Sequence, residues 1–191
     1  TQDWTVIQGN TDEMIANFSD TVYENVKSGA EIMANALEQD VNEISDENKK
    51  YLKNLPINKS VEIEGLKILF VHGSPRRNNE NVFPNMDMDE IEKIFFEVDA
   101  DVVFCGHTHM PCGYQTNDKV TVVNDGSVGR PFTENPKACY VIAGINAGNI
   151  EIEHRMVDYD KASAAAILEK RQFAGAEKLA QMLINPEKRH M

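Results

Sequence analysis

The sequence has little cysteine, no long apolar run and few basic residues relative to acidic ones. Its three cysteines, Cys105, Cys112 and Cys139, include no Cys-x-x-Cys pair. This usage favours a reducing cytoplasm over a disulfide-stabilised scaffold. No stretch resembles a signal peptide or a membrane-spanning helix. We therefore expect a cytoplasmic protein with no membrane partner.

The shortage of basic residues limits the possible partners. Lysine and arginine number 19 against 31 aspartates and glutamates, which gives a formal net charge of -12. Without a basic stripe to offset repulsion from phosphates, nucleic acid and anionic membranes are excluded as partners. A small phosphorylated substrate remains compatible, because bound divalent cations would reverse the local sign. We expect residues 1–191 to form a single domain, which could also form a homo-oligomer.

The stretch from Val102 to His109 is the most informative in the chain. Four apolar residues, Val102 to Cys105, predict a short strand that is covered on both faces. Gly106-His107-Thr108-His109 follows, at the carboxyl end of the strand, where open α/β sheets bind ligands. We expect Gly106 to allow a sharp turn that presents both imidazoles to one site. Imidazole nitrogen suits zinc, iron, manganese and nickel.

Two further segments repeat this arrangement. The apolar strand predicted at 67–71 ends in His72 and Gly73, and histidine is rare in this chain, with only five residues. A short strand predicted at Thr5–Gln8 is followed by Gly9 and Asn10. The amide oxygen of Asn10 is a hard ligand that could complete a mixed nitrogen and oxygen shell. The sequence thus predicts a metal site formed by Asn10, His72, His107 and His109.

With Gly-Asn-Thr-Asp, His-Gly and Gly-His-Thr-His in this order, the chain resembles the calcineurin-like metallophosphoesterases. It is most similar to their small bacterial and archaeal phosphodiesterase branch, which carries an Asn-Pro-Gly-Ser turn after the Gly-His-Thr-His strand. Here Asn124-Asp125-Gly126-Ser127 resembles that turn, with Asp125 in place of proline. The resemblance implies a four-layer α/β/β/α sandwich of two mixed sheets flanked by helices.

The resemblance also implies the chemistry. Asn10, His72 and His107 match ligands of one metal, and His109 matches a ligand of a second. The expected ions are divalent, Mn or Zn first, with Fe, Ni or Mg as further candidates. The implied reaction is hydrolysis of a phosphate ester by a water activated between two metals. We predict Arg76 and Arg130 as substrate-binding residues.

The chain also departs from the family pattern. The motifs Asp-x-His and Gly-Asp-x-x-Asp, which supply the remaining ligands, do not occur in it. The sequence-based expectation is that one or two N-terminal βα units are missing, which would leave the chain with few ligands and little activity. Thr11 stands where the phosphatase version of the motif has a histidine that protonates the leaving group. This difference favours phosphodiesters over monoesters.

Two other interpretations stay open. A metallo-β-lactamase type of zinc hydrolase also has a His-x-His turn, but an Asp-His pair should follow it, whereas Met110 and Pro111 follow here. A catalytically inactive, metal-binding interaction module on the same fold would explain the absent ligand motifs. Asp12 and Asp125 are candidates for orienting the histidine rings.

The remaining segments read as alternating helices and strands. The expected helices are 12–44 with Asp12 as N-cap and a break near Ser28-Gly29, one capped by Ser45, one capped by Asp87 or Asp89, and one beginning at Asp160 or Lys161. The expected strands are 61–64, 66–71, 120–123, 138–145 and 150–157. We expect His154 on the surface and residues 184–191 as a disordered tail.

Overall fold

The computed structural model describes residues 4–134 and 136–185. Its main sheet contains β1 (Asn58–Ile63), β2 (Leu66–Val71), β3 (Val102–Cys105), β4 (Cys112–Gln115) and β5 (Thr121–Asn124), in the order β1-β2-β3-β5-β4. The three central strands, β2, β3 and β5, are parallel to one another. The two edge strands, β1 and β4, pair antiparallel with their neighbours. The main sheet is therefore mixed.

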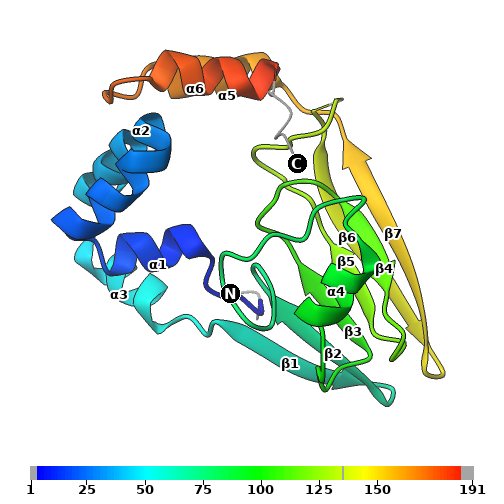
Figure 1. Cartoon of the computed structure of the whole chain (residues 1–191). Coiled ribbons are helices and arrows are strands. Elements are labelled where there is room, and N and C mark those ends of the chain that lie inside the picture. The colour runs from blue at the N-terminus through cyan, green and yellow to red at the C-terminus, as the bar shows by residue number, and fades with distance from the viewer. Residues whose placement is uncertain (1–3, 135, 186–191) are drawn as a thin grey trace.

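The remaining elements cover this sheet or lie beside it. The hairpin of β6 (Ala138–Asn146) and β7 (Asn149–Val157) forms a second sheet. Figure 1 shows α4 (Met88–Ile94) on the main sheet, with α1 (Asn10–Ala16), α2 (Asp20–Glu43) and α3 (Asp46–Asn54) beside it. The last helices, α5 (Lys161–Glu169) and α6 (Ala176–Ile184), lie next to α2. The predicted α/β fold with two sheets is confirmed, but β6 and β7 are antiparallel, so the second sheet is not mixed.

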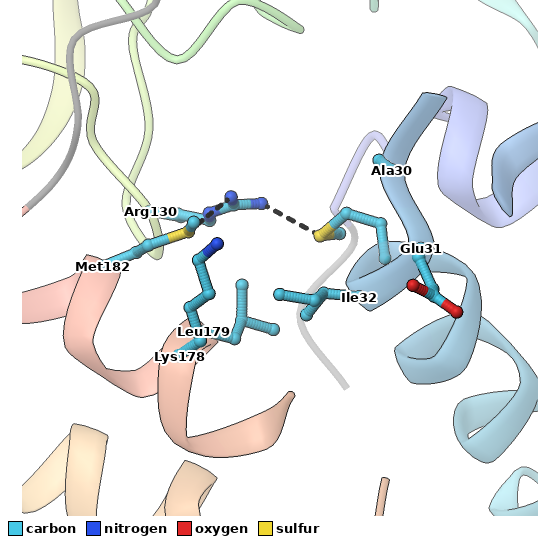
Figure 2. A pocket seen from close by; sticks show the side chains of 8 residues that line it. Ala30, Glu31, Ile32, Arg130, Lys178, Leu179 and Met182 are labelled. Carbon is cyan, nitrogen blue, oxygen red and sulfur yellow. Dashed lines mark hydrogen bonds between the residues drawn. The ribbon is translucent and has the colours of Figure 1, made fainter. Parts of the chain in front are cut away.

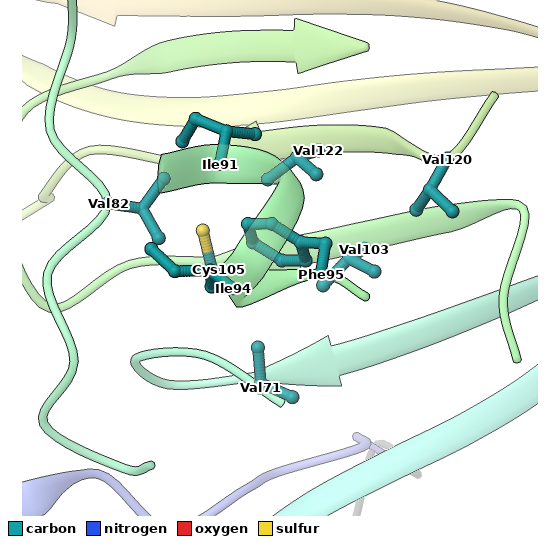
Figure 3. Close-up of a cluster of buried hydrophobic side chains, with 9 residues drawn as sticks. All are labelled: Val71, Val82, Ile91, Ile94, Phe95, Val103, Cys105, Val120 and Val122. Atoms are coloured by element: carbon teal, nitrogen blue, oxygen red, sulfur yellow. The ribbon is translucent and has the colours of Figure 1, made fainter. Parts of the chain in front are cut away.

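Both faces of the main sheet are packed. On one face, α4 contributes Ile91 and Ile94 to a cluster of buried side chains that Figure 3 shows. From the strands that cluster receives Val71, Val103, Cys105 and Val122. On the other face, Val102 and Phe104 pack beneath the β6–β7 hairpin. All four residues of β3 are buried, as the sequence predicted, because β3 lies in the centre of the sheet with cover on both sides.

The N-terminal elements differ from the prediction. Thr5–Gln8 is not a strand; Gln8 instead donates its backbone N–H to the carbonyl of Pro56 and its side-chain amide to that of Leu52. Asp12 is not the N-cap, because α1 already begins at Asn10 after Gly9. The predicted helix over 12–44 is two helices, and Ser19 caps the second by accepting from the Val22 N–H.

Several other boundaries follow the predicted signals. The backbone of α2 is non-helical at Ala30, next to the predicted break at Ser28-Gly29. The side chains of Ser45 and Asp87 cap α3 and α4. The sequence analysis missed β4 and predicted one C-terminal helix where there are two, separated by Gly175 at φ +99°. Of the tail predicted at 184–191, Ile184 is instead the last residue of α6, and residues 186–191 lie outside the described residues.

In the described part of the chain, no helix combines the length and the apolar character that crossing a bilayer requires.

Replacement of Val103 by alanine tests the importance of the buried central strand. Val103 has no exposed surface, so Val103→Ala should leave a cavity and lower the free energy of unfolding by about 1–3 kcal/mol. Val128, which is 66% exposed, is the matched control, and Val128→Ala should change stability by less than about 0.5 kcal/mol. Urea denaturation of both variants measures the difference, and equal midpoints would contradict the packing described above.

Candidate metal centre

The turn after β3 holds two histidines in an unusual backbone conformation. His107 and His109 have φ angles of +64° and +60°, in the left-handed region that non-glycine residues rarely adopt. Gly106, which was predicted to allow the turn, is not among the glycines with positive φ. The strained geometry therefore falls on the two histidines themselves. Such strain persists only where surrounding structure enforces it, and it concentrates at functional sites.

The buried side chain of Asn124 enforces this turn. Its Nδ2 lies 2.9 Å from the carbonyl oxygen of Val82, 2.9 Å from that of Gly106 and 2.9 Å from Thr108 Oγ1. Thr108, between the two histidines, has no exposed surface and also donates to the Val82 carbonyl. Asn124 is itself fully buried. One amide at the end of β5 thus fixes the turn at the end of β3.

Three of the predicted ligands meet at one point. Asn10, the first residue of α1, places its Oδ1 2.8 Å from His72 Nε2 and 3.3 Å from His107 Nδ1. The rings of His72 and His107 approach edge to face, with centroids 5.2 Å apart. Gly9 permits this approach, because a Cβ there would lie 3.2 Å from the His72 ring. The ends of α1, β2 and β3 therefore bring an amide oxygen and two imidazoles together.

His109, the fourth predicted ligand, is oriented by a separate contact. Its Nδ1 donates to the carbonyl oxygen of Arg130 over 2.7 Å. This bond selects the tautomer in which Nε2 is the basic nitrogen, as a hydrogen bond to the other ring nitrogen does for metal-binding histidines. His109 lines the same cavity of about 430 Å³ as Asn10 and His107.

The surroundings favour neutral imidazole. Burial lowers the pKa of His72, an effect that nearby Asp12 opposes and His109 reinforces. A neutral ring is the form that binds a metal. Asp12, one of the two predicted orienting carboxylates, accepts a hydrogen bond from the backbone N–H of Gly9 over 2.8 Å.

The donor set fits one divalent ion. One amide oxygen with two imidazoles suits manganese, zinc, iron or nickel. Within residues 4–134 and 136–185, no three His, Cys, Asp or Glu side chains form a metal-binding group. The candidate site therefore has three ligands only when the amide oxygen of Asn10 is counted with His72 and His107. His109 is the remaining predicted ligand near this cluster.

The two predicted arginines occupy different places. Arg76 donates to Glu80 over 2.5 Å and to the backbone carbonyl of Lys93 over 2.9 Å. It is not among the residues that line the cavity at the histidines. Arg130 does line that cavity, and its guanidinium lies 5.0 Å from the ring centre of Phe132.

Sequence reasoning missed three residues that support the site. The roles of Asn124 and Thr108 follow from contacts across the sheet, which no local pattern reveals. His154 was expected on the surface, but it is partly buried and donates from Nε2 to the Asn124 carbonyl over 2.8 Å. Alternation in β7 could have indicated this placement, because Ile150 and Ile152, on the same face, pack against the core.

The chain is similar in sequence to known proteins. Residues 1–148 match the family model described as the calcineurin-like phosphoesterase superfamily domain. The chain is 32% identical over 133 residues to the uncharacterized protein MJ0912 of Methanocaldococcus jannaschii, covering 61% of this chain and 51% of that protein. It is 31% identical over 81 residues to a probable metallophosphoesterase of Methanothermobacter thermautotrophicus, covering 42% of each. The chain spans about half the length of these curated relatives.

Two solved structures share the fold. The hypothetical protein PH1004 from Pyrococcus horikoshii superposes with a TM-score of 0.82 at 22% identity, over 99% of this chain and 75% of that one. A metallophosphoesterase from Sphaerobacter thermophilus gives a TM-score of 0.70 at 20% identity, over 94% and 75% of the two chains. At these identities the likeness establishes the fold.

Replacing Asn124 by aspartate tests its role in the turn. Aspartate keeps the size but loses the N–H donors to Val82 and Gly106, so Asn124→Asp should lower the free energy of unfolding by about 2–4 kcal/mol. Mn²⁺ affinity, measured by calorimetry at a temperature below the thermal unfolding midpoint of the variant, should fall about 10- to 100-fold. Asn81→Asp makes the same charge change at an exposed position and should alter neither quantity. Wild-type stability in Asn124→Asp would show that the turn does not depend on this amide.

Asp125 gives a pH-dependent prediction. Burial raises its pKa from 3.8 to about 7, and its Oδ1 has no hydrogen-bond partner among the described residues. Since the folded state binds this proton more tightly than the unfolded state, the associated stability is complete below about pH 4 and lost as the pH rises through about 7. Asp125→Asn should therefore stabilise the protein at about pH 7.5 by about 1–2 kcal/mol, with little effect at about pH 4.

Thermal and urea unfolding across this pH range would measure the effect. Asp118→Asn, at an exposed position, is the control. If Asp125→Asn changes stability equally at both ends of the range, the carboxyl group does not titrate as described.

Proposed function

Because this chain belongs to the calcineurin-like phosphoesterase superfamily, we propose that it hydrolyses phosphodiesters with the help of bound divalent metal ions. Family membership supports phosphoric ester hydrolysis and a requirement for divalent metal. The observation that carries the narrower proposal is the convergence of Asn10 with His72 and His107 beside His109. Small phosphorylated molecules are the proposed substrates.

Asn10, His72 and His107 would hold one ion, and His109 would contribute to a second. Mn²⁺ or Zn²⁺ best matches the donor set, and Fe, Ni and Mg are further candidates. A bound ion there would polarise a phosphoryl oxygen and lower the pKa of a water molecule, so that hydroxide is available as the nucleophile near neutral pH.

The residues of the chain have separable tasks in this proposal. Burial lowers the pKa of His72 and so favours the neutral ring that can bind a metal, and the Arg130 carbonyl fixes the tautomer of His109. The Arg130 side chain adds a cation to the wall of the same cavity, where it complements the charge of a phosphate group.

Thr11 supports diesters as the substrate class. It lines the cavity beside Asn10, at the position where the phosphatase version of the motif has histidine. A hydroxyl group is too weak an acid to protonate a leaving group near neutral pH. Substrates with leaving groups that depart without this help, as from activated diesters, are therefore favoured.

A second candidate is a metal-binding interaction module without catalytic activity. The supporting observation is the small donor set, since no three His, Cys, Asp or Glu side chains gather in the described part of the chain. Such a protein would bind metal at Asn10, His72 and His107 but would turn over no phosphate ester.

Hydrolysis of bis-p-nitrophenyl phosphate and p-nitrophenyl phosphate with Mn²⁺ separates these candidates. The diester should be hydrolysed faster than the monoester, and EDTA should abolish both activities. Asn10→Ala and His107→Gln should each reduce diester hydrolysis and Mn²⁺ affinity by about 10- to 100-fold, because each removes a donor. Asn79→Ala, at an exposed position, is the matched control for Asn10→Ala.

Each result has a distinct meaning. Stoichiometric Mn²⁺ binding without turnover of either ester would favour the interaction module. Faster hydrolysis of p-nitrophenyl phosphate than of bis-p-nitrophenyl phosphate would contradict the proposed preference for diesters.

A further inference from the structure

The cavity at the histidines continues into a second, largely apolar one. The first, of about 430 Å³, extends from Asn10, His107 and His109. The second, of about 390 Å³, is also lined by Ile32 and Leu179. Four residues line both cavities, namely Ala30, Met33, Arg130 and Met182. Each volume lies in the range of small-molecule sites.

Arg130 marks the junction. Its guanidinium donates to the sulfur atoms of Met33 and Met182 over 3.3 and 3.4 Å, and Figure 2 shows Arg130 beside Met182. Thioether sulfur is a weak acceptor, so exchanging these contacts for a phosphate oxygen is favourable. The arginine thus separates a polar end, with the histidines, from an apolar end.

The apolar end has a soft aliphatic lining. Met33 and Met182 line it together with Ile32 and Leu179, and Figure 2 shows the side chains of Ile32 and Leu179 pointing toward one another. Methionine side chains are flexible and polarisable and adapt to ligands of different shapes. A nucleobase requires several fixed hydrogen-bonding groups, whereas Glu31, Arg130 and Lys178 supply the polar side chains of this lining and its other side chains are apolar.

Segments far apart in the sequence assemble this lining. Met33 follows the non-helical residue Ala30 in α2, and Met182 comes from α6. Arg171 joins the C-terminal helices to α2 through Asp40, with a distance of 2.8 Å between Nη2 and Oδ1. The Asn35 amide adds a bond to the Ala174 carbonyl over 3.1 Å.

From this continuity we infer that the substrate is a phosphate ester with an aliphatic group, and that the group occupies the cavity between α2 and α6. The inference rests on the proposed function, because it places the phosphate beside His107 and His109. Arg130 then contacts the phosphate, and Met33 and Met182 contact the first methylenes of the alkyl chain. The chain ends against Ile32 and Leu179.

Non-hydrolysable alkylphosphonic acids test this assignment by binding alone. Calorimetry with methyl-, butyl- and hexylphosphonic acid, in Mn²⁺ and separately in EDTA, should show affinity rising about two- to fourfold per methylene. Ala30→Phe, which places a ring where the two cavities join, should flatten this series to within about twofold. Ala162→Phe, at an exposed position of α5 outside both linings, should leave it intact.

A second pair of variants checks the lining chemically. Met33→Gln should weaken hexylphosphonic acid binding by about three- to tenfold and methylphosphonic acid binding by less than twofold. Met33→Leu, which keeps the surface apolar, should retain most of the increase in affinity from methyl- to hexylphosphonic acid.

The outcomes separate this inference from the proposed function. A flat series in the wild-type chain, absent binding, or a series that Ala30→Phe leaves unchanged overturns the inference. Hydrolysis of bis-p-nitrophenyl phosphate under those circumstances would still uphold the proposed function. A rising series without hydrolysis of any ester would support the alkyl site and contradict the proposed function.

Discussion

The candidate metal centre depends on one buried amide. Asn124 holds a backbone turn in which two histidines adopt left-handed φ angles, and these angles are unfavourable unless the turn is fixed from outside. The amide satisfies carbonyl groups of two separate segments, at Val82 and Gly106. Since Asn124 has no exposed surface, water cannot replace these bonds. The parallel pairing of β3 with β5 brings the amide to the turn. The geometry of the site therefore depends on the order of the strands in the sheet.

The sequence predicted the parts of the site that lie at the ends of apolar strands. His72 and His107 follow short, largely apolar strands, and parallel pairing brings such ends to one edge of a sheet. The α/β fold with two sheets was predicted from the resemblance to the calcineurin-like metallophosphoesterases, which the motifs at these strand ends carry. The prediction of a strand at Thr5–Gln8 was wrong, because four residues are too few to distinguish a strand from a loop that packs on α3.

What could not be predicted depends on contacts between distant residues. Arg76 and Arg130 look alike in the sequence, yet one pairs with Glu80 and the other lines the cavity at the histidines. Nothing local marks Asn124 as the residue that fixes the turn. The apolar cavity is formed by α2 and α6 together, and their shared surface appears only when the C-terminal helices fold back onto α2.

Sequence separation within the site has a consequence for folding. Asn10 and His107 are 97 positions apart, and so are Met33 and Arg130. Contacts between residues so far apart close long loops, and closing a long loop costs conformational entropy. The site should therefore be among the last parts of the chain to become ordered. An ion bound by both Asn10 and His107 would then act as a cross-link over a long loop. It would stabilise the native topology relative to the unfolded chain, in addition to any part it has in catalysis.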